Sequence, residues 1–174
     1  PAENSRFGES KIMAKDVNEL FDNIYFVNNG YIEGGDILRI NDHFIIGISS
    51  RTNTAGAENL SNILNDLGAT AEISITPKNI LHLKSECSLI DEETILMSQN
   101  MMEKNIFNKK YKFLFIPEGE EIAANTLRIN NNLLIPSNCP KTEKMLSKNY
   151  NLISLKVDEV FKLDAGLSCM SLRW

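Results

Sequence analysis

The stretch that decides the fold is residues 37–75, ILRINDHFIIGISSRTNTAGAENLSNILNDLGATAEISI. Apolar residues alternate on both sides of Asn41 and Asp42, two residue types that tolerate the positive φ of a hairpin turn. This pattern predicts two antiparallel strands, and a helix and a third strand follow them. The stretch therefore predicts a unit of strand, tight turn, strand, helix and strand.

Residues 126–155, TLRINNNLLIPSNCPKTEKMLSKNYNLISL, can be laid over this first unit, with the turn at Asn130–Asn131–Asn132. A weaker copy lies between the two. It consists of a first strand at 80–90, a turn at 91–93, a second strand at 94–97, a helix at 99–109 and a last strand at 111–116. Units that recur roughly every 40 residues are typical of an array or a propeller, not of a doubly wound sheet.

Both ends of the chain extend the repeat. Residues 9–21 resemble the helix and residues 24–27, IYFV, the last strand of a preceding unit, whereas residues 167–173 resemble the first strand of a following one. We therefore expect three full ββαβ units with a partial unit on each side, which form a single α/β domain over 1–174. A closed ring would need strands from upstream sequence, so we expect this domain to be N-terminally incomplete.

Composition narrows the class of partner. The 174 residues are 43% hydrophobic with a formal charge of −5, and the sequence pI is about 5.1. Nucleic acid and anionic membranes select clustered Lys and Arg, so neither is an expected partner. No stretch approaches the roughly 20 apolar residues of a membrane-spanning helix. The expected partner is a small molecule or another protein.

The cysteines limit the redox chemistry. Cys87, Cys139 and Cys169 are odd in number and lack the spacing of a zinc site or a disulfide framework. We expect reduced thiols, a cytoplasmic location and no metal. Cys87 is expected on a strand and Cys139 in a loop.

Cys169, in GLSCMSLRW, has two interpretations. It is either a buried structural thiol or a nucleophile, and a nucleophile needs a base and an orienting acid nearby. His82 lies in the first strand of its unit, at the place that Cys169 takes in its own, and equivalent first strands of a propeller converge on the axis. His43 begins a strand after a turn and is expected to be solvated. The equivalent positions of the two residues in their repeat units therefore predict that Cys169 lies close to His82.

Residues 31–40, YIEGGDILRI, supply the acid. Gly34 and Gly35 allow close approach of the backbone to a ligand, and Glu33 or Asp36 would orient a histidine or bind a cationic substrate. The alternative is an ordinary polar turn.

Two arginines are candidate carboxylate ligands. Arg6 and Arg51 each lie in a polar loop just before a helix, where a guanidinium fork would clamp a substrate carboxylate. The alternatives are solvated surface charges and, in the second loop, simple capping of the helix by Thr52 or Asn53.

Six motifs together resemble the dimethylarginine dimethylaminohydrolases, a branch of the guanidino-group-modifying (pentein) superfamily that includes arginine deiminase. They are ENSRFGE (3–9), IEGGDILRI (32–40), GISSRTNTAGAENL (47–60), LHLKS (81–85), AANTLRINNNLLIPSNCPKT (123–142) and LDAGLSCMSLR (163–173). The resemblance runs through the whole chain in order. It implies a five-fold pseudosymmetric α/β propeller.

The resemblance also implies the roles of the site residues, which are Cys169 as nucleophile, His82 as general acid/base, Glu33 as the acid that orients it, Arg6 and Arg51 as ligands of the substrate carboxylate, and the backbone carbonyl near Leu163 as a ligand of the α-amino group. No metal or organic cofactor is implied. The implied activity is hydrolysis of Nω-methylated arginine, a small-molecule substrate, to citrulline and dimethylamine or methylamine.

Three alternatives stay open. Arginine deiminases of the superfamily carry an aspartate two residues after the histidine, and this chain has Lys84 there, which favours a methylated arginine over free arginine. An arginine deiminase or amidinotransferase is the next candidate, and a non-catalytic binding protein is the third. The resemblance further implies an acidic segment and a substrate lid upstream of Arg6. Either the chain is a fragment of a longer enzyme or a separate N-terminal segment completes the ring. A homodimer is the other candidate assembly.

Overall fold

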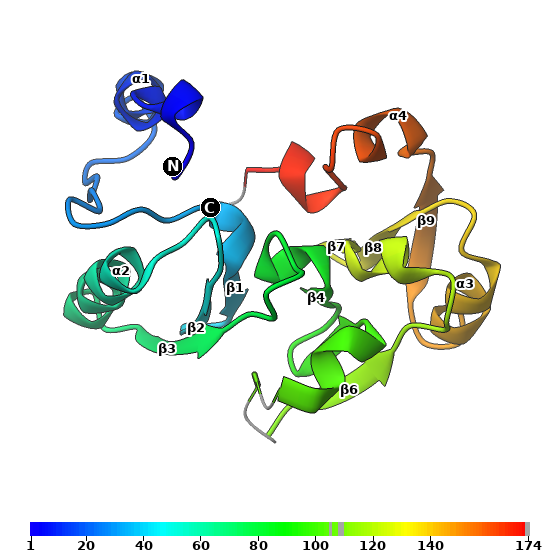
Figure 1. Ribbon diagram of the computed structural model, residues 1–174. Coiled ribbons are helices and arrows are strands. Elements are labelled where there is room, and N and C mark those ends of the chain that lie inside the picture. The colour runs from blue at the N-terminus through cyan, green and yellow to red at the C-terminus, as the bar shows by residue number, and fades with distance from the viewer. Residues whose placement is uncertain (105, 108–109, 173–174) are drawn as a thin grey trace.

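The computed structural model describes residues 1–104, 106–107 and 110–172, which form three consecutive repeat units, each built on its own three-stranded sheet (Figure 1). The first unit consists of β1 (Ile37–Ile40), β2 (His43–Ile48), α2 (Thr54–Asp66) and β3 (Thr70–Ile75). The second consists of β4 (Cys87–Leu89), β5 (Thr94–Met97) and β6 (Lys112–Phe115). The third consists of β7 (Leu127–Ile129), β8 (Asn132–Pro136), α3 (Pro140–Leu146) and β9 (Asn151–Leu155).

Each sheet has the topology that the repeat predicts. The first two strands pair antiparallel and the third pairs parallel with the second, as in the register Leu38 to Ile45 and Ile46 to Ile73. Asn41 and Asn130 have φ of 55° and 53°, the left-handed conformation that Asn tolerates in a hairpin turn. The two predicted hairpins are therefore confirmed, although Asn132 already belongs to β8.

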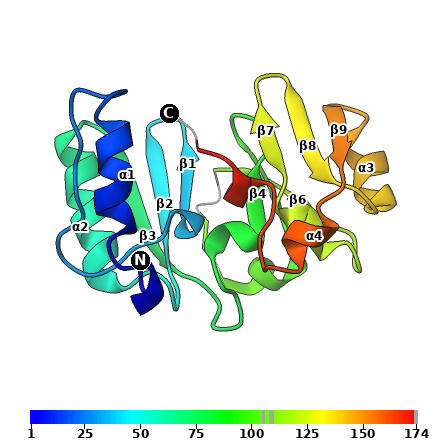
Figure 2. The ribbon, with the colours of Figure 1, turned by 90° about the horizontal axis from the view of Figure 1, so that it is seen from above.

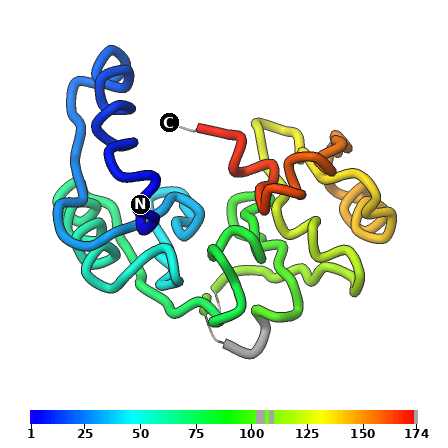
Figure 3. Tube along the Cα trace, turned by 45° about the horizontal axis from the view of Figure 1, so that its top comes forward, coloured from blue at the N-terminus to red at the C-terminus, as the bar shows by residue number. Residues whose placement is uncertain are grey.

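The sheets are arranged as an open arc. The first strands β1, β4 and β7 lie on its inner side, where β1 contacts β4 and β4 contacts β7, and the third strands lie on its outer side (Figures 1 and 2). The trace in Figure 3 shows the same arc, with α1 (Glu9–Val17) at one end and the third unit at the other. This arrangement is three consecutive units of an α/β propeller.

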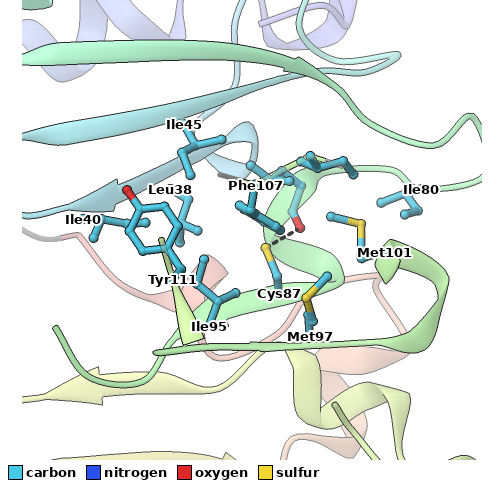
Figure 4. Close-up of a cluster of buried hydrophobic side chains, with 12 residues drawn as sticks. Leu38, Ile40, Ile45, Ile80, Cys87, Ile95, Met97, Met101, Phe107 and Tyr111 are labelled. Carbon is cyan, nitrogen blue, oxygen red and sulfur yellow. Dashed lines mark hydrogen bonds between the residues drawn. The ribbon is translucent and has the colours of Figure 1, made fainter. Parts of the chain in front are cut away.

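The hydrophobic core lies between neighbouring units. One cluster joins Leu38 and Ile45 of the first sheet to Cys87, Ile95 and residues around them in the second unit (Figure 4). A second cluster joins Leu96, Ile116, Leu133, Ile135 and Leu146 of the second and third units. Burial between adjacent repeats is how a repeat protein gains stability, because one sheet alone cannot cover its own apolar faces.

The first strand of the second unit is much shorter than predicted. Only Cys87–Leu89 pairs as β4, and Leu83–Ser85 before it forms a 3₁₀ turn, η3. The backbone N–H of Leu83 donates to the Asp36 carboxylate over 2.9 Å, so this N–H is taken by a side chain and cannot join a sheet ladder. The prediction that His82 lies within a strand is wrong, since it directly precedes η3.

The prediction of a helix at 99–109 is also wrong in the type of helix. Gln99–Lys104 forms a 3₁₀ helix, and residues 105, 108 and 109 lie outside the described residues. Asn100 favours turns and caps over helix interiors, which agrees with the absence of an α-helix in the described part of this segment.

The terminal segments differ from the prediction as well. Helix α1 ends at Val17, four residues earlier than expected, and residues 24–27 form no strand. A third strand of this repeat pairs with a second strand, and the structure describes no strand that pairs with residues 24–27. At the other end a short helix, α4 (Asp158–Phe161), was not predicted.

The C-terminal segment carries no strand among its described residues. Ser168–Met170 forms a 3₁₀ turn, η6, whose N–H groups bond locally and to the Asn125 side chain, and residue 173 of the predicted strand lies outside the described residues. Cys169 therefore lies on a turn and not on a strand.

Candidate active site

A 3₁₀ turn precedes the first strand of every unit. These turns are η2 (Gly34–Asp36), η3 and η5 (Glu121–Ala124), and η6 repeats the pattern after the third unit. Turn η2 contacts η3, and η3 contacts η5. The segment that carries η6 returns from α4 toward β1 (Figures 1 and 2). The turns thus gather on the inner side of the arc.

Glu33 and His82 occupy equivalent places, one residue before η2 and η3. Both have extended backbones, with φ and ψ of −123° and 141° for Glu33 and −140° and 151° for His82. In η6 the equivalent residue is Leu167. The expectation that His82 and Cys169 share one position in the repeat is therefore wrong, because Cys169 lies two residues further along its turn.

The pairing of acid and histidine is direct. His82 Nε2 lies 2.9 Å from Glu33 Oε2, and the Glu33 side chain is only 7% exposed. Gly35 makes the approach possible, because a Cβ built there would lie 2.5 Å from His82 Cγ. The close neighbour of Gly35 is thus a side chain of this chain, and the predicted approach of the glycine pair to a ligand stays a prediction. A Cβ on Gly34 would meet nothing within 4 Å.

Two arginines surround the same carboxylate. Arg6 Nη1 lies 3.0 Å and Arg51 Nη1 3.9 Å from Glu33 Oε1. Burial is the largest influence on the Glu33 carboxyl and opposes its ionisation, but the hydrogen bond with His82 and the charge of Arg6 outweigh it and hold the pKa of Glu33 below its usual value. The site therefore contains an ionised, nearly buried carboxylate.

Both arginines already bind carboxylates of the chain itself. Arg6 donates from Nε and Nη2 to the two oxygens of Glu9, over 3.0 and 2.8 Å, and Arg51 Nη1 lies 2.9 Å from Glu3 Oε1. Each guanidinium group is thus placed where it can bind a carboxylate group.

The helix α2 is capped by Asn53 and not by Thr52. The Asn53 side chain accepts a hydrogen bond from Gly56 N over 2.9 Å.

Cys169 is exposed, whereas Cys87 and Cys139 are buried, and all three thiols are free. Burial raises the pKa of the Cys87 thiol, and it raises that of Cys139 to about 11, so neither is suited to act as a thiolate. As predicted, Cys87 lies on a strand, and Cys139 directly precedes α3. The prediction of a buried structural thiol does not hold for Cys169.

Among the described residues, neither a hydrogen bond nor an ion pair links Cys169 or Leu163 to the other proposed site residues. No hydrogen bond joins Cys169 to His82 among the described residues, and Leu163 is 80% exposed after α4. A cavity of about 410 Å³ is lined by Leu81, which precedes His82 in the sequence, and by Gly166, three residues before Cys169. The structure thus brings Glu33, His82, Arg6 and Arg51 together, and the pairing with Cys169 stays a prediction.

Asn125 was not singled out by the sequence. Its Oδ1 accepts from Ser168 N over 2.8 Å, and a Cβ on Gly166 would lie 2.5 Å from its Cγ. It therefore anchors η6 next to η5. No local sequence pattern marks Asn125, because its partners lie 41 to 43 residues away.

His43 was expected to be solvated, but its Nδ1 forms a hydrogen bond with Thr70 Oγ1 over 2.7 Å, and the side chain is half-buried.

Neither a group of metal ligands nor a membrane-spanning helix is found in the described ranges. Across 1–104, 106–107 and 110–172, no three His, Cys, Asp or Glu side chains are grouped as metal ligands. In the same part of the chain, every helix is too short or too polar to cross a bilayer.

Comparison with known proteins shows which families the chain is similar to. Residues 12–118 match the arginine deiminase family. The N(G),N(G)-dimethylarginine dimethylaminohydrolase of Pseudomonas aeruginosa is 33% identical over 100% of this chain and 69% of its own length, and that of Streptomyces coelicolor is 27% identical over 99% and 66%. This chain thus spans about two thirds of these relatives.

A solved structure agrees with the sequence comparison. The Pseudomonas aeruginosa enzyme in complex with citrulline superposes with a TM-score of 0.94 at 31% identity, over 100% of this chain and 69% of that one. The match extends over all three units and both flanking segments. The chain therefore belongs to the dimethylarginine dimethylaminohydrolase family of the pentein superfamily.

Proposed function

We propose that this chain carries the catalytic residues of a cysteine hydrolase that converts Nω-methylated arginine to citrulline and dimethylamine or methylamine. The observation that carries the proposal is the ionised Glu33 carboxylate, bonded to His82 and flanked by Arg6 and Arg51. The citrulline complex of the Pseudomonas relative supports the product.

In the proposed reaction the Cys169 thiolate attacks the central carbon of the substrate guanidinium and forms a C–S bond. Protonated His82 gives its proton to the departing alkylamine, and the C–N bond breaks to leave a covalent thiouronium. Neutral His82 then takes a proton from water, which adds to the same carbon. The C–S bond breaks, the remaining proton of the added hydroxyl passes to solvent or to the released amine, and citrulline and the free thiolate are released.

Glu33 has an electrostatic and orienting role in this scheme. Its carboxylate lies 2.9 Å from His82 Nε2, fixes the ring and stabilises the imidazolium that the first step requires. Arg6 and Arg51 would hold the substrate carboxylate in place of Glu9 and Glu3, and the carbonyl near Leu163 would accept from the α-amino group. No step requires a metal or an organic cofactor.

Lys84 favours the methylated substrate. It follows His82 by two residues on η3, where the resembling arginine deiminases place a carboxylate for the unmodified guanidinium nitrogens. A methylated nitrogen has fewer N–H groups to donate, so a carboxylate there would be left unpaired. An arginine deiminase or amidinotransferase is the second candidate function.

We also propose that residues 1–174 act as one domain in the cytoplasm, completed by an N-terminal segment or by a second copy. The exposed apolar side chains of α1, Ile12 and Met13, support an additional covering element. The molar mass in solution, measured by light scattering on the complete protein, separates a dimer from a monomer.

The test of function is citrulline release by the complete protein from asymmetric dimethylarginine, with arginine in parallel. Turnover confined to the methylated substrate and lost in Cys169→Ser is the expected result. Equal or faster turnover of arginine would favour the deiminase. A fully active Cys169→Ser variant would exclude this nucleophile.

A further inference from the structure

Asp36 is a carboxylate outside the catalytic scheme, and it is fully buried. Its Oδ2 accepts from Ser49 Oγ and from Thr52 Oγ1, each over 2.7 Å, and its Oδ1 accepts from Leu83 N over 2.9 Å. Both oxygens are therefore satisfied by donors from two other segments of the chain. Charge-assisted hydrogen bonds of this kind are short and strongly directional.

Two of these donors bracket Arg51. Ser49 N donates to Thr52 O over 3.0 Å and closes a tight turn, and Arg51 N donates to Ser49 Oγ over 2.9 Å. Asp36 accepts from both hydroxyl groups at the base of this turn. The direction in which the Arg51 side chain leaves the loop is thereby tied to Asp36.

The remaining contacts reach the acid and the histidine. Leu83, whose N–H Asp36 accepts, directly follows His82 and is itself fully buried. Thr52 Oγ1, besides donating to Asp36, accepts from Glu33 N over 3.1 Å. One buried carboxylate thus connects the backbone segments that carry Glu33, Arg51 and His82.

We infer that Asp36 is a positioning residue, which fixes Arg51 and His82 relative to Glu33 through Thr52, Ser49 and Leu83. The inference rests on the proposed function and extends it to a residue that touches neither substrate nor reacting atoms. Removing its charge changes the placement of groups on two sides of the substrate at once. Both substrate binding and the chemical step then suffer.

The chain offers a matched control in its third unit. Glu120 precedes η5 as Glu33 precedes η2, is 6% exposed, and accepts from Lys141 N, Thr142 N and Thr142 Oγ1 over 2.7 to 2.9 Å. Thr142, like Thr52, is fully buried. This network holds the start of α3 and includes none of the proposed site residues.

The experiment compares Asp36→Asn with Glu120→Gln in the complete protein, with asymmetric dimethylarginine as substrate. Asp36→Asn is expected to lower kcat/KM by about 10- to 100-fold, with KM raised through Arg51 and kcat lowered through His82, because misplacement of about 1 Å has effects of this size. Glu120→Gln is expected to leave both constants within about two-fold, since its hydrogen bonds reach only Lys141 and Thr142 at the start of α3. Equal effects of the two variants would overturn the inference.

If Asp36→Asn does not fold, variants of Thr52 and Thr142 test the same inference. Thr52→Val keeps the shape of the side chain but removes the hydroxyl between Glu33 and Asp36, so KM and kcat should both change. Thr52→Ser should restore them, and Thr142→Val should leave them unchanged. Unaltered kinetics in Thr52→Val would count against Asp36.

A spectroscopic readout separates this inference from the proposed function. The chain has two histidines, so ring ¹⁵N signals of His82 and His43 can be assigned by substitution. Asp36→Asn should shift the His82 signals and leave those of His43 in place, and Glu120→Gln should shift neither. If the wild type proves inactive on every arginine tested, the proposed function fails, and these signals still decide whether Asp36 positions His82.

Discussion

At the scale of single residues, the site depends on keeping Glu33 charged in a place that disfavours charge. Its carboxylate lies next to two guanidinium groups and one imidazole, and these contacts offset the cost of removing it from water. Loss of the proton from Glu33 is therefore coupled to folding. This coupling has a measurable pH dependence.

We expect Glu33 to stabilise the fold only above acidic pH. Its pKa is lower in the folded state than the value of about 4.3 in an unfolded chain. The folded state thus binds the proton more weakly, and the stabilisation is present above the unfolded pKa and lost as pH falls through the folded one. The free energy of unfolding of Glu33→Gln, measured in urea, should be below that of the wild type at pH 5 and approach it toward pH 3. A difference that stays constant down to pH 3 would contradict an ionised Glu33.

Gly35→Ala should remove activity, and Gly34→Ala should not. The Cβ at residue 35 would lie 2.5 Å from His82 Cγ, so the ring has to leave Glu33, whereas the Cβ at residue 34 has open space. We expect a loss of kcat of about 100-fold for Gly35→Ala, as for other displaced catalytic groups. Steady-state kinetics of the two variants test this. Equal activity of both would show that His82 does not need its present position.

The cysteines should respond differently to serine. Cys87 is fully buried, so a hydroxyl there should lower the free energy of unfolding by about 1 kcal/mol, toward the low end of the usual range because Leu83 O, 3.3 Å from Cys87 Sγ, would accept from it. Cys169 is exposed, and Cys169→Ser should change stability by less than about 0.5 kcal/mol. Urea unfolding of both variants measures this. A large loss for Cys169→Ser would assign it a structural role.

At the scale of secondary-structure elements, the hairpins and third strands were predictable because their signals are local. Alternating apolar residues around Asn41 and Asn130 contain all that a hairpin needs. The 3₁₀ turns were not predictable, because η3 depends on a carboxylate 47 residues earlier, at Asp36, that takes the N–H of Leu83. His82 and Cys169, two of the proposed site residues, lie at such turns, so their local structure was not predictable from the sequence.

The same reasoning predicts a role for Asn125 in holding η6. Asn125→Ala removes the acceptor of Ser168 N and frees the turn that carries Cys169. We expect kcat to fall by about 10-fold and alkylation of Cys169 by iodoacetamide to change in rate, since the thiol loses its fixed surroundings. Asn59→Ala is the control, because Asn59 Oδ1 accepts from Asn28 N over 2.9 Å in the same manner. An identical response of the two variants would leave Asn125 without a special role.

At the scale of the whole molecule, the site belongs to an interface between repeats. Glu33 and Arg51 come from the first unit and its entry, and His82 from the entry to the second, so their geometry depends on how the two units pack. The number of units followed from the repeat in the sequence. The side chains that meet across each interface could not be predicted from the repeat, because the pleating and register of the strands in three dimensions determine these contacts.

Strand β5 allows the two interfaces to be tested separately. It is buried on both faces, and its successive residues enter different clusters. Ile95 belongs to the cluster with Leu38 and Leu83 between the first and second units, and Leu96 belongs to the cluster with Leu133 between the second and third. Both side chains are fully buried. Truncation of either to alanine should therefore lower the free energy of unfolding by a similar amount, about 2–4 kcal/mol.

Activity should distinguish the two truncations where stability does not. Ile95→Ala opens a void in the cluster that also contains Leu83, the neighbour of His82, and should lower kcat/KM of the folded protein by about 10-fold, because the site lies across that interface. Leu96→Ala loosens an interface without Glu33, Arg51 or His82 and should leave kcat/KM within about two-fold. Denaturation curves and kinetics under fully folding conditions provide both quantities. A larger loss of activity in Leu96→Ala would show that the third unit, and the cysteine turn beyond it, depends more on repeat packing than the histidine does.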